Sequence, residues 1–360
     1  MISIAARAIP IGVVSCEALT CLHDWIESGA NAGMAYMANW PELRRDPEGL
    51  LPGARTMIAL AIPFPLPPGG APSGPVASYA LGLDYHDLIR NLFRPALRKL
   101  TEKGMGEWRL CVDSAPVMER YWSVKSGLGR LTRSGMVSVD GFGTACFLFE
   151  LLTTATPAQL GLMGNAPLTA SDFADLFGID AAVPDIALDD IKPSECTQCG
   201  RCEKACPAGA LSGGYCEKTL ITRETSGNYY GKVDARFCLS YLTIEHRGPF
   251  DTPEAARAMS TPAGRETLFG CDRCVTSCPL NRFPYRNQGN LRFLSGLLPV
   301  SAIASLTKER CAEMTQEEFS RLFKGSPIKR AKLEGLRRNA NSLPLYPGIK
   351  QPPDDQNDWP

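Results

Sequence analysis

The sequence predicts a mixed α+β / α/β chain of several domains: an α/β domain, then a cysteine-rich domain, then a short helical C-terminal segment. Three observations predict this fold class. Residues 1–155 alternate short apolar runs with amphipathic stretches, seven cysteines fall into two short runs after residue 193, and residues 286–346 have the pattern of helices. A length of 360 residues with 44% hydrophobic content is enough for two or three domains with real cores.

Individual elements of the α/β domain can be placed from apolar runs and capping residues. The run Thr56–Ile62, bounded by Pro-Gly and by Pro63, predicts a buried strand. Asp84 is expected to cap an amphipathic helix that Pro95 should end or kink. Residues 108–112 return as a strand, and Asp113-Ser114-Ala115-Pro116 is expected to start the next helix.

The remaining boundaries follow composition. Residues 156–192 mix Pro, Gly, Ala and Asp and are expected to connect the two domains. The cysteine-rich domain then covers 193–285 and the helical segment 286–346. Residues 347–360, with four prolines and several acidic residues, are expected to form a disordered tail.

The cysteine runs have the spacing of iron–sulfur proteins. The first run is Cys196-x2-Cys199-x2-Cys202-x3-Cys206-Pro207. In bacterial ferredoxins three thiolates of such a run bind one 4Fe–4S cube and the fourth crosses to a second cube. The second run, Cys271-x2-Cys274-x3-Cys278-Pro279, supplies three more thiolates, so an eighth ligand must come from elsewhere.

The missing ligand has two candidate sources. A complete second run would have a cysteine at position 268, where the chain has Leu268. Cys216 and Cys238 lie between the runs, and we favour Cys238 because residues 236–241 suggest an ordered strand or helix entry, whereas Cys216 follows two glycines. The crossing rule then predicts Cys196, Cys199, Cys202 and Cys278 for one cube, and Cys206, Cys238, Cys271 and Cys274 for the other.

Zinc and disulfides fit this pattern less well. A zinc site would use two Cys-x2-Cys pairs, whereas the first run alone has four cysteines at x2, x2, x3 spacing. Closely spaced thiols in a chain of this size without an export signal indicate a reducing compartment. The remaining cysteines show no mutual ligand spacing and are expected to be small buried apolar residues: Cys16, Cys21, Cys111, Cys146, Cys216 and Cys311.

Charge restricts the partners. Thirty-eight basic and thirty-eight acidic residues cancel, so a nucleic-acid surface must be a local patch. Residues 321–338 hold seven basic residues against Glu334, and either a phosphate-binding face or a solvated helix surface fits that charge. The seven are Arg321, Lys324, Lys329, Arg330, Lys332, Arg337 and Arg338. No apolar run approaches the roughly 18 residues of a membrane span, so we expect a cytoplasmic monomer without membrane contact.

Several blocks of the sequence resemble epoxyqueuosine reductases, in the same order across most of positions 11–340. They are Pro52–Arg55, Tyr79–His86, Val112–Arg120, Ser126–Gly129, Cys238–Glu245 and Gly270–Cys274. The resemblance implies a nitroreductase-like α/β domain that holds base-off cobalamin against a ferredoxin-like domain with two 4Fe–4S clusters. It also implies queuosine synthesis, by reduction of epoxyqueuosine in the anticodon loop of a substrate tRNA, with electrons from an external donor such as flavodoxin or ferredoxin.

The resemblance also implies site residues. It gives the cysteine assignment above, including Cys238, and makes Asp113 the proton donor. Such a role requires burial to raise the pKa of the carboxyl group, and the local alternative is that Asp113 only caps a helix. The implied cobalamin contacts are Asn39, Asp113, Val137, Leu148, Leu151 and Ser240.

Other positions depart from family patterns. Residues 84–89 come within one residue of Asp-x-His-x-x-Gly, a motif for histidine ligation of cobalt, but Ile89 replaces the glycine, so His86 is expected to be structural. Asn39 stands where relatives commonly have a basic residue. Residues 130–133 read Arg-Leu-Thr-Arg where the family has Trp-x-Gly-Lys. Two alternatives stay open. One is a related reductase of small molecules such as organohalides, favoured if the altered segment 130–133 closes the approach of RNA. The other is a non-catalytic electron carrier to a corrinoid protein.

Overall fold

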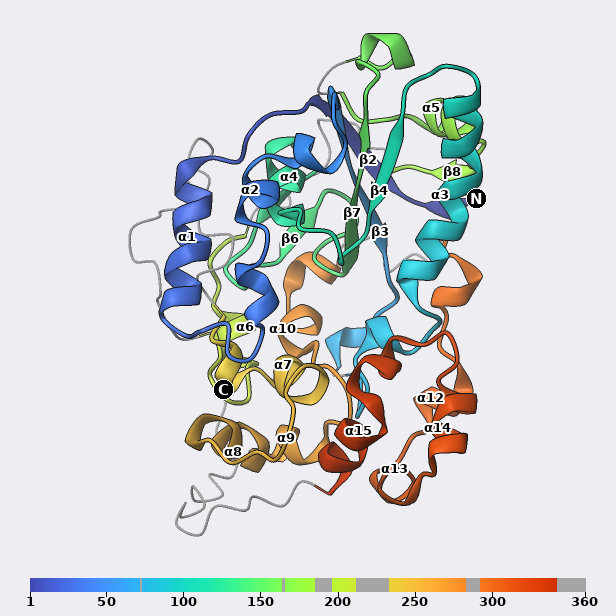
Figure 1. The fold of residues 1–360 in the computed structure, drawn as a ribbon. Helices are drawn as coiled ribbons and strands as arrows, with labels where there is room; N and C mark the ends of the chain where they lie inside the picture. The colour runs from blue at the N-terminus through green and yellow to red at the C-terminus, as the bar shows by residue number, and fades with distance from the viewer. Residues whose placement is uncertain (72, 164–165, 185–195, 212–232, 283–291, 342–360) are drawn as a thin grey trace.

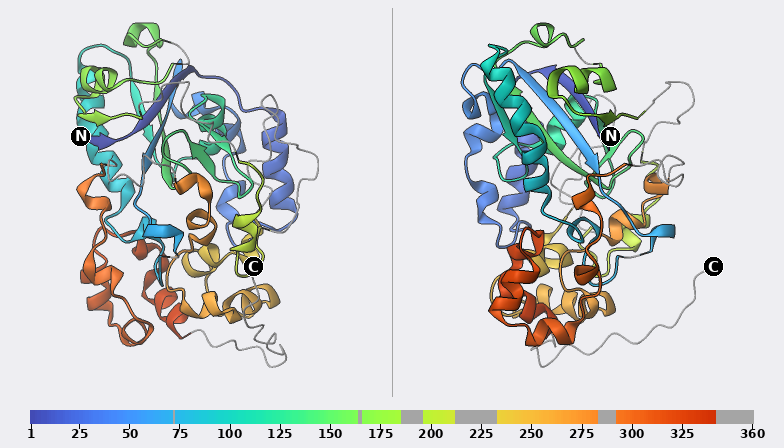
Figure 2. Two further views of the ribbon diagram at one scale, coloured as in Figure 1. Left: turned by 180° about the vertical axis from the view of Figure 1, so that it is seen from behind. Right: turned by 90° about the vertical axis from the view of Figure 1, so that its right-hand side faces the viewer.

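The chain forms a sheet-containing half and a half built of short helices (Figure 1). The structure is a computed structural model that describes residues 1–71, 73–163, 166–184, 196–211, 233–282 and 292–341. Views from behind and from the side show the same division, with the N-terminus in the sheet-containing half (Figure 2). None of the described helices is long and apolar enough to cross a membrane.

A four-stranded antiparallel sheet forms the centre of the first half. Its order is β2 (Ala5–Pro10), β3 (Thr56–Pro63), β7 (Cys146–Thr153) and β4 (Trp108–Cys111). All residues of β3 are buried because both faces of the sheet are covered. The strands predicted at residues 56–62 and 108–112 are therefore confirmed.

Helix α3 (Tyr85–Glu102) covers one face of the sheet. Its buried side chains, among them Phe93 and Leu97, join a core with alternate residues of β3 and β7. Of the two outcomes expected at Pro95, an end or a kink, the end is wrong, because α3 continues for seven further residues. Burial of the residues on both sides of Pro95 outweighs the one backbone hydrogen bond that proline cannot make.

The opposite face is covered by α4 (Glu119–Lys125) and the hairpin of β5 (Gly129–Leu131) and β6 (Val137–Val139). These elements form a second apolar core with the other set of alternating residues, including Met57 and Leu152. The two faces of β7 therefore belong to different cores.

The segment expected to connect the domains packs back on the first half. It contains η5 (Ala158–Leu160), α5 (Ala170–Asp172), η6 (Phe173–Phe177) and β8 (Ala181–Ala182). Strand β8 pairs in parallel with β1 (Ile2–Ser3), which brings the segment beside the start of the chain. The exact domain boundaries stay a prediction.

Short helices build the other half. Those of the cysteine-rich region are α6 (Arg201–Lys204), η7 (Ala235–Phe237), α7 (Leu239–Ile244), α8 (Pro253–Ser260), α9 (Pro262–Glu266), α10 (Arg273–Thr276) and η8 (Pro279–Arg282). The described part of the C-terminal segment consists of short helices joined by turns and short connections, as expected. Its helices are η9 (Ser295–Leu297), α12 (Ser301–Ala304), α13 (Lys308–Glu313), α14 (Gln316–Leu322), η10 (Pro327–Ala331) and α15 (Lys332–Ala340). The predicted tail, 347–360, lies outside the described residues.

The N-terminal region after β2 packs against the cysteine-rich half. It contains α1 (Cys16–Glu27), η1 (Ala35–Ala38), α2 (Pro41–Arg45) and η2 (Pro47–Leu50). The Trp25 indole donates to the Val233 carbonyl at 2.7 Å, and the backbone N–H of Gly33 donates to the Tyr241 hydroxyl at 2.8 Å. Residues 16–40 therefore join the two halves.

Candidate active site and cysteine clusters

Asp113 lies in the loop after β4, in a backbone conformation unusual for a residue with a side chain. Its φ is +54°, in the left-handed region that Asp and Asn tolerate better than most residues. The helix expected at Asp113 is wrong, because α4 begins at Glu119 with Met118 as its N-cap. A left-handed residue cannot be the extended N-cap that the Asp-Ser-Ala-Pro pattern suggested.

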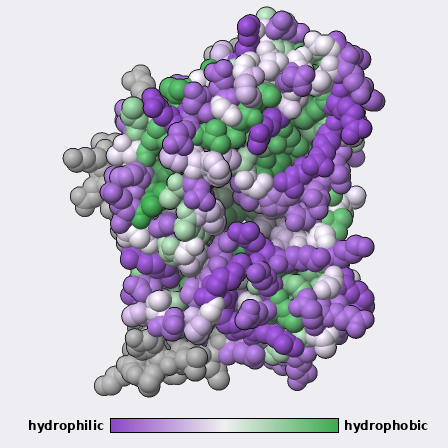
Figure 3. Space-filling view, viewed as in Figure 1, coloured by the Kyte–Doolittle hydropathy of each residue, from purple (hydrophilic) through white to green (hydrophobic). Residues whose placement is uncertain are grey.

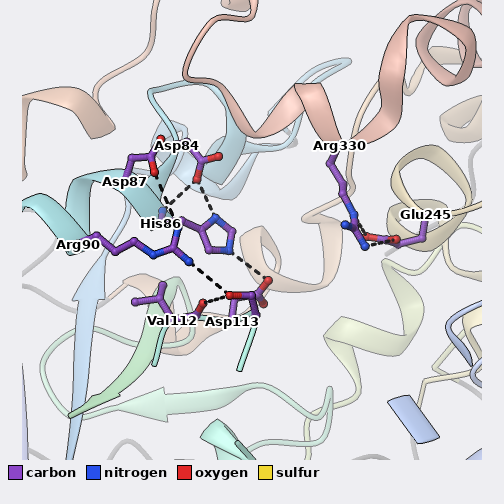
Figure 4. A network of polar contacts seen from close by, with 9 residues as sticks. Asp84, His86, Asp87, Arg90, Val112, Asp113, Glu245 and Arg330 are labelled. Atoms are coloured by element: carbon purple, nitrogen blue, oxygen red, sulfur yellow. Dashed lines mark hydrogen bonds and ion pairs between the residues drawn. The ribbon is translucent and has the colours of Figure 1, made fainter. Parts of the chain in front are cut away.

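Asp113 is joined to the start of α3 by His86 (Figure 4). The ring nitrogen Nε2 of His86 lies 3.2 Å from Asp113 Oδ2, and Nδ1 lies 2.7 Å from Asp84 Oδ1. Asp84 also accepts the backbone N–H of His86 at 3.0 Å, which confirms its predicted role as N-cap. The cap thus holds the ring that reaches Asp113.

The two carboxylates keep His86 protonated. Burial alone would lower the pKa of His86, but hydrogen bonds to Asp113 and Asp84, with their charges, raise it to about 9. Asp113 itself is not in the buried pocket expected for it, because its side chain is 66% exposed. The proton-bearing group held at this site is therefore the imidazolium of His86, with Asp113 as its exposed partner.

Aromatic rings hold His86 in place. The Tyr85 ring stacks on the His86 ring with centroids 4.1 Å apart, and on Phe147 of β7 at 4.2 Å. Burial and then the charge of Asp113 raise the pKa of Tyr85 and of Tyr79, so both phenols stay neutral. His86, expected from sequence to be structural, thus connects Asp113 to the sheet and to α3. The sequence signal was its position two residues after a capping Asp.

An ion pair from the other half of the chain lies across from Asp113 (Figure 4). Arg330 binds Glu245 through two hydrogen bonds of 2.8 and 2.9 Å, and its guanidinium lies 6.0 Å from the centroid of the Tyr36 ring. Burial and then the charge of Glu245 raise the pKa of Tyr36 to about 12, and Asp113 contributes to this shift. The surface is hollowed near this boundary between the two halves (Figure 3).

The residues expected to contact cobalamin differ in position and in exposure. Asn39 is exposed at the end of η1, where its carbonyl accepts from Arg44 Nε at 3.2 Å, and Ser240 is half-buried in α7. Leu148 is the one residue of β7 that is not buried. Val137 is nearly buried on the same face of the sheet as Leu148. The structure does not bring the Leu151 side chain to them, because it lies fully buried on the α3 face.

The described cysteines form two neighbourhoods. The thiol of Cys278 is close enough to Cys196, Cys202 and Cys199 for their charges to act on it. Cys274 is influenced in the same way, most strongly by Cys271, Cys238 and Cys206 and less by Cys202. Cys238 lies between η7 and α7, which confirms the expected helix entry, whereas Cys216 lies outside the described residues.

The distances between the cysteine sulfurs can be compared with those in a zinc site. Among the described residues, no three cysteine sulfurs lie within 4.8 Å of one another. Zn–S bonds of about 2.3 Å in a tetrahedron would place the sulfurs about 3.8 Å apart. Burial raises the pKa of Cys271 to about 12 and that of Cys274 well above its usual value, so these thiols need a strongly cationic metal centre to ionise. The described cysteine sulfurs are therefore not gathered as the ligands of a tetrahedral zinc site would be.

Two carboxyl groups are buried behind Asp113. Glu150 is completely buried in β7, and neither of its carboxyl oxygens has a hydrogen-bond partner among the described residues. Glu119 is half-buried as a residue, but its Oε1 is also buried and unpartnered. Burial, then the charge of Asp113, raises the pKa of Glu119 to about 8, and burial raises that of Glu150 further. Both groups are therefore neutral near pH 7.

This buried pair predicts that stability depends on pH. Because the pKa of Glu119 is about 8 in the folded chain and about 4.3 when unfolded, the folded state binds the proton more tightly. The free energy of unfolding should therefore fall on the order of 2–4 kcal/mol between about pH 5 and pH 8. Glu119→Gln should flatten this fall in thermal-unfolding scans, and the exposed Glu102→Gln should not. An equally steep fall in both variants would contradict the assignment.

The basic segment 321–338 does not form one free face. Arg338 points inward and donates to the carbonyls of His246, Gly248 and Leu242 at 2.7–3.1 Å. Its guanidinium lies 4.5 Å from the centroid of the Phe250 ring, and burial lowers its pKa to about 10. Arg330 and Arg337 also have protein partners, the latter at the Met314 carbonyl. The other four basic residues of this segment are exposed and form no ion pair within the described part of the chain: Arg321, Lys324, Lys329 and Lys332.

Comparisons with known proteins agree with this geometry. The family described as epoxyqueuosine reductase QueG, DUF1730, matches residues 44–114, and a 4Fe-4S double cluster binding domain matches 195–281. An epoxyqueuosine reductase from Cyclobacterium marinum is 31% identical over 325 residues, covering 88% of this chain and 85% of the relative. An epoxyqueuosine reductase from Gloeobacter violaceus is 31% identical over 329 residues, covering 91% of this chain and 86% of the relative.

Solved structures show the same fold. An epoxyqueuosine reductase crystallised with an epoxyqueuosine-modified tRNA-Tyr stem loop matches with a TM-score of 0.65 at 20% identity, covering 93% of this chain and 75% of that one. The enzyme from Bacillus subtilis matches with a TM-score of 0.63 at 20% identity over the same shares. The sequence relatives, alike over most of both lengths, decide the assignment: the chain belongs to the epoxyqueuosine reductase family.

Proposed function

We propose that this protein reduces epoxyqueuosine to queuosine in the anticodon loop of tRNA, with cobalamin and two 4Fe–4S clusters as cofactors. The observation that carries the proposal is the His86–Asp113 pair, a proton source at the boundary between the sheet and the cysteine-rich half. Conversion of the epoxide to an alkene and water consumes two electrons and two protons. When bound, the cofactors would supply the electrons, so the residues of the chain have to deliver the protons.

Asp113 is the group placed to pass a proton from His86 to the departing oxygen. Its exposure leaves the carboxyl group open to a substrate, and His86 at 3.2 Å can return a proton after each transfer. The Bacillus subtilis relative of known structure has a catalytic aspartate loop that can swing out of its active site. The left-handed Asp113 is likewise in a loop and not in a helix, which supports an equivalent role here.

His86 should set the alkaline limit of activity. Because its pKa is raised to about 9, the ring carries its proton at neutral pH and loses it above about pH 9. His86→Gln should lower the rate about 10- to 100-fold, at the low end of general acid–base contributions, and the remaining activity should no longer decline near pH 9. Single-turnover rates across pH measure this. His23→Gln, at the exposed His23 of α1, should keep the parent profile.

Two neighbourhoods of cysteines support the ligand sets. We assign one cube to Cys196, Cys199, Cys202 and Cys278, and the other to Cys206, Cys238, Cys271 and Cys274. For cobalamin, the fit rests on Leu148, an apolar side chain left half-exposed in a strand that is otherwise buried. A corrin ring with apolar faces would cover it. Asn39, Val137 and Ser240 would lie around the ring, and Leu151 would contribute only through its backbone.

The partner assignments extend the same proposal. Tyr36 and Trp40 are 42% and 63% exposed, and such aromatic faces suit the stacking of unpaired anticodon bases. Lys329 and Lys332 would contact phosphates. The segment 130–133, which differs from the family pattern, contacts the cysteine-rich half through the ion pair between Arg133 and Glu203. The difference in sequence therefore does not by itself favour a small-molecule substrate. We further propose flavodoxin or ferredoxin as electron donor, and a cytoplasmic monomer.

Nucleoside analysis tests this function directly. The protein, reconstituted anaerobically with iron, sulfide and cobalamin, would be incubated with a strong reductant and an anticodon stem-loop bearing epoxyqueuosine. Loss of epoxyqueuosine with matching formation of queuosine is the expected result. Unchanged RNA from protein that has bound cobalamin and both clusters would reject the proposal, and reduction of an organohalide by the same sample would favour the small-molecule alternative.

A further inference from the structure

Arg133 is held in a fixed turn between β5 and β6. The Thr132 N–H donates to the Met136 carbonyl at 2.8 Å, and the Thr132 hydroxyl reaches the same carbonyl at 2.9 Å and Ser134 Oγ at 3.0 Å. Gly135 closes the turn with a φ of +76°, a conformation that suits glycine. The turn therefore presents Arg133 in one orientation, from the sheet-containing half toward the cysteine-rich half.

Arg133 meets the first cysteine run in two ways. Its backbone N–H points at the sulfur of Cys196, with N and Sγ 3.4 Å apart. Its side-chain Nε lies 2.6 Å from Glu203 Oε1, in the helix α6 that directly follows Cys199.

We propose that Arg133 and Glu203 act as a charge pair that sets the reduction potential of the cube bound by Cys196, Cys199, Cys202 and Cys278. This inference rests on the ligand sets of the proposed function. Reduction adds a negative charge to a cube, so a nearby cation and an N–H donor to a ligand sulfur favour the reduced form. A nearby carboxylate opposes it. Because Arg133 is 34% exposed and Glu203 25%, solvent screens both charges only in part.

The two charges should therefore act with opposite signs. Arg133→Met removes the cation and should make the potential of this cube more negative. Glu203→Gln removes the carboxylate and should make it more positive. We expect each change to alter the equilibrium constant for reduction about tenfold, which is about 59 mV for a one-electron couple. Both are positioning residues, because neither is a ligand.

A potentiometric titration followed by electron paramagnetic resonance, on protein with both clusters and without tRNA, measures the two potentials. Arg130→Met is the matched control. Arg130 lies in the same hairpin but pairs with Asp140 at 3.5 Å, and it should leave both potentials unchanged. Iron content per chain would first show that each variant retains its clusters.

A fourth variant separates this inference from the ligand assignment it uses. Cys199→Ala should remove one cube, and the signal it removes should be the one that Arg133→Met shifts. Suppose that Cys199→Ala removes one cube, but Arg133→Met and Glu203→Gln shift the potentials no more than Arg130→Met does, or shift them in the same direction. The charge pair is then rejected and the ligand set stands. If Cys199→Ala leaves both cubes, the assignment itself fails.

Discussion

Replacing Asp113 by asparagine should lower the rate of epoxide reduction by about 10²- to 10⁴-fold, the usual contribution of a positioned general acid. Asparagine keeps the shape of the side chain and can still accept a hydrogen bond from His86, but it cannot transfer a proton. It also tolerates the φ of +54° nearly as well as aspartate, so the loop should keep its conformation. Single-turnover reduction of an epoxyqueuosine stem-loop measures the effect.

Asp87→Asn is the control for this substitution. Asp87 lies in the same network, 3.8 Å from Arg90, but contacts neither His86 nor Asp113 through a hydrogen bond. Its variant should keep the parent rate, and both variants should keep the parent midpoint of thermal unfolding and the parent cobalamin content. If Asp113→Asn retains the parent rate with both cofactors bound, the proton comes from another group and Asp113 is not the donor.

The site residues differ in how far sequence could predict them. The cysteine runs encode short local loops, so their spacing predicts seven of the eight ligands of two cubes, but it leaves the eighth open between Cys216 and Cys238. The buried strand β3 was equally local, because its apolar run is continuous. The sheet order was not local: β7 lies between β3 and β4 although it follows both in the chain. Only tertiary packing decides that insertion.

The errors have physical causes of the same kind. Asp113 precedes Ser-Ala-Pro, which is a good local N-cap pattern, but its contact with His86, 27 residues earlier, holds it in a left-handed turn. The positive charge of Arg338 suggested a phosphate contact, yet three backbone carbonyls of the cysteine-rich half bind it. In both cases the decisive partner is distant in sequence, so neither propensity nor charge pattern could identify it.

Substitution of Cys238, the proposed eighth ligand, should have the clearest effect on cofactor content. Cys238→Ala should lower iron from about eight to about four atoms per chain, because a cube needs four thiolates, and should abolish reduction of the tRNA. The structure favours Cys238 on two grounds. Burial raises the pKa of its thiol, but the backbone N–H groups of Tyr241 and Ser240 point at its sulfur and partly offset this, and the thiol of Cys206 is close enough for its charge to act on Cys238.

Cys216→Ala provides the discriminating comparison, because Cys216 was the only rival donor between the two cysteine runs. That variant should keep about eight iron atoms per chain, as should Cys16→Ala, at a cysteine on α1 that is exposed and not buried as the sequence predicted. Iron and sulfide analysis with electron paramagnetic resonance would be done on all three after the same anaerobic reconstitution. Loss of one cube from Cys216→Ala but not from Cys238→Ala would move the ligand to Cys216. The thiols of Cys271 and Cys274 are buried, and burial raises their pKa values. Without a metal centre they would therefore stay protonated, so we do not expect this cube to be partly occupied after loss of its fourth thiolate.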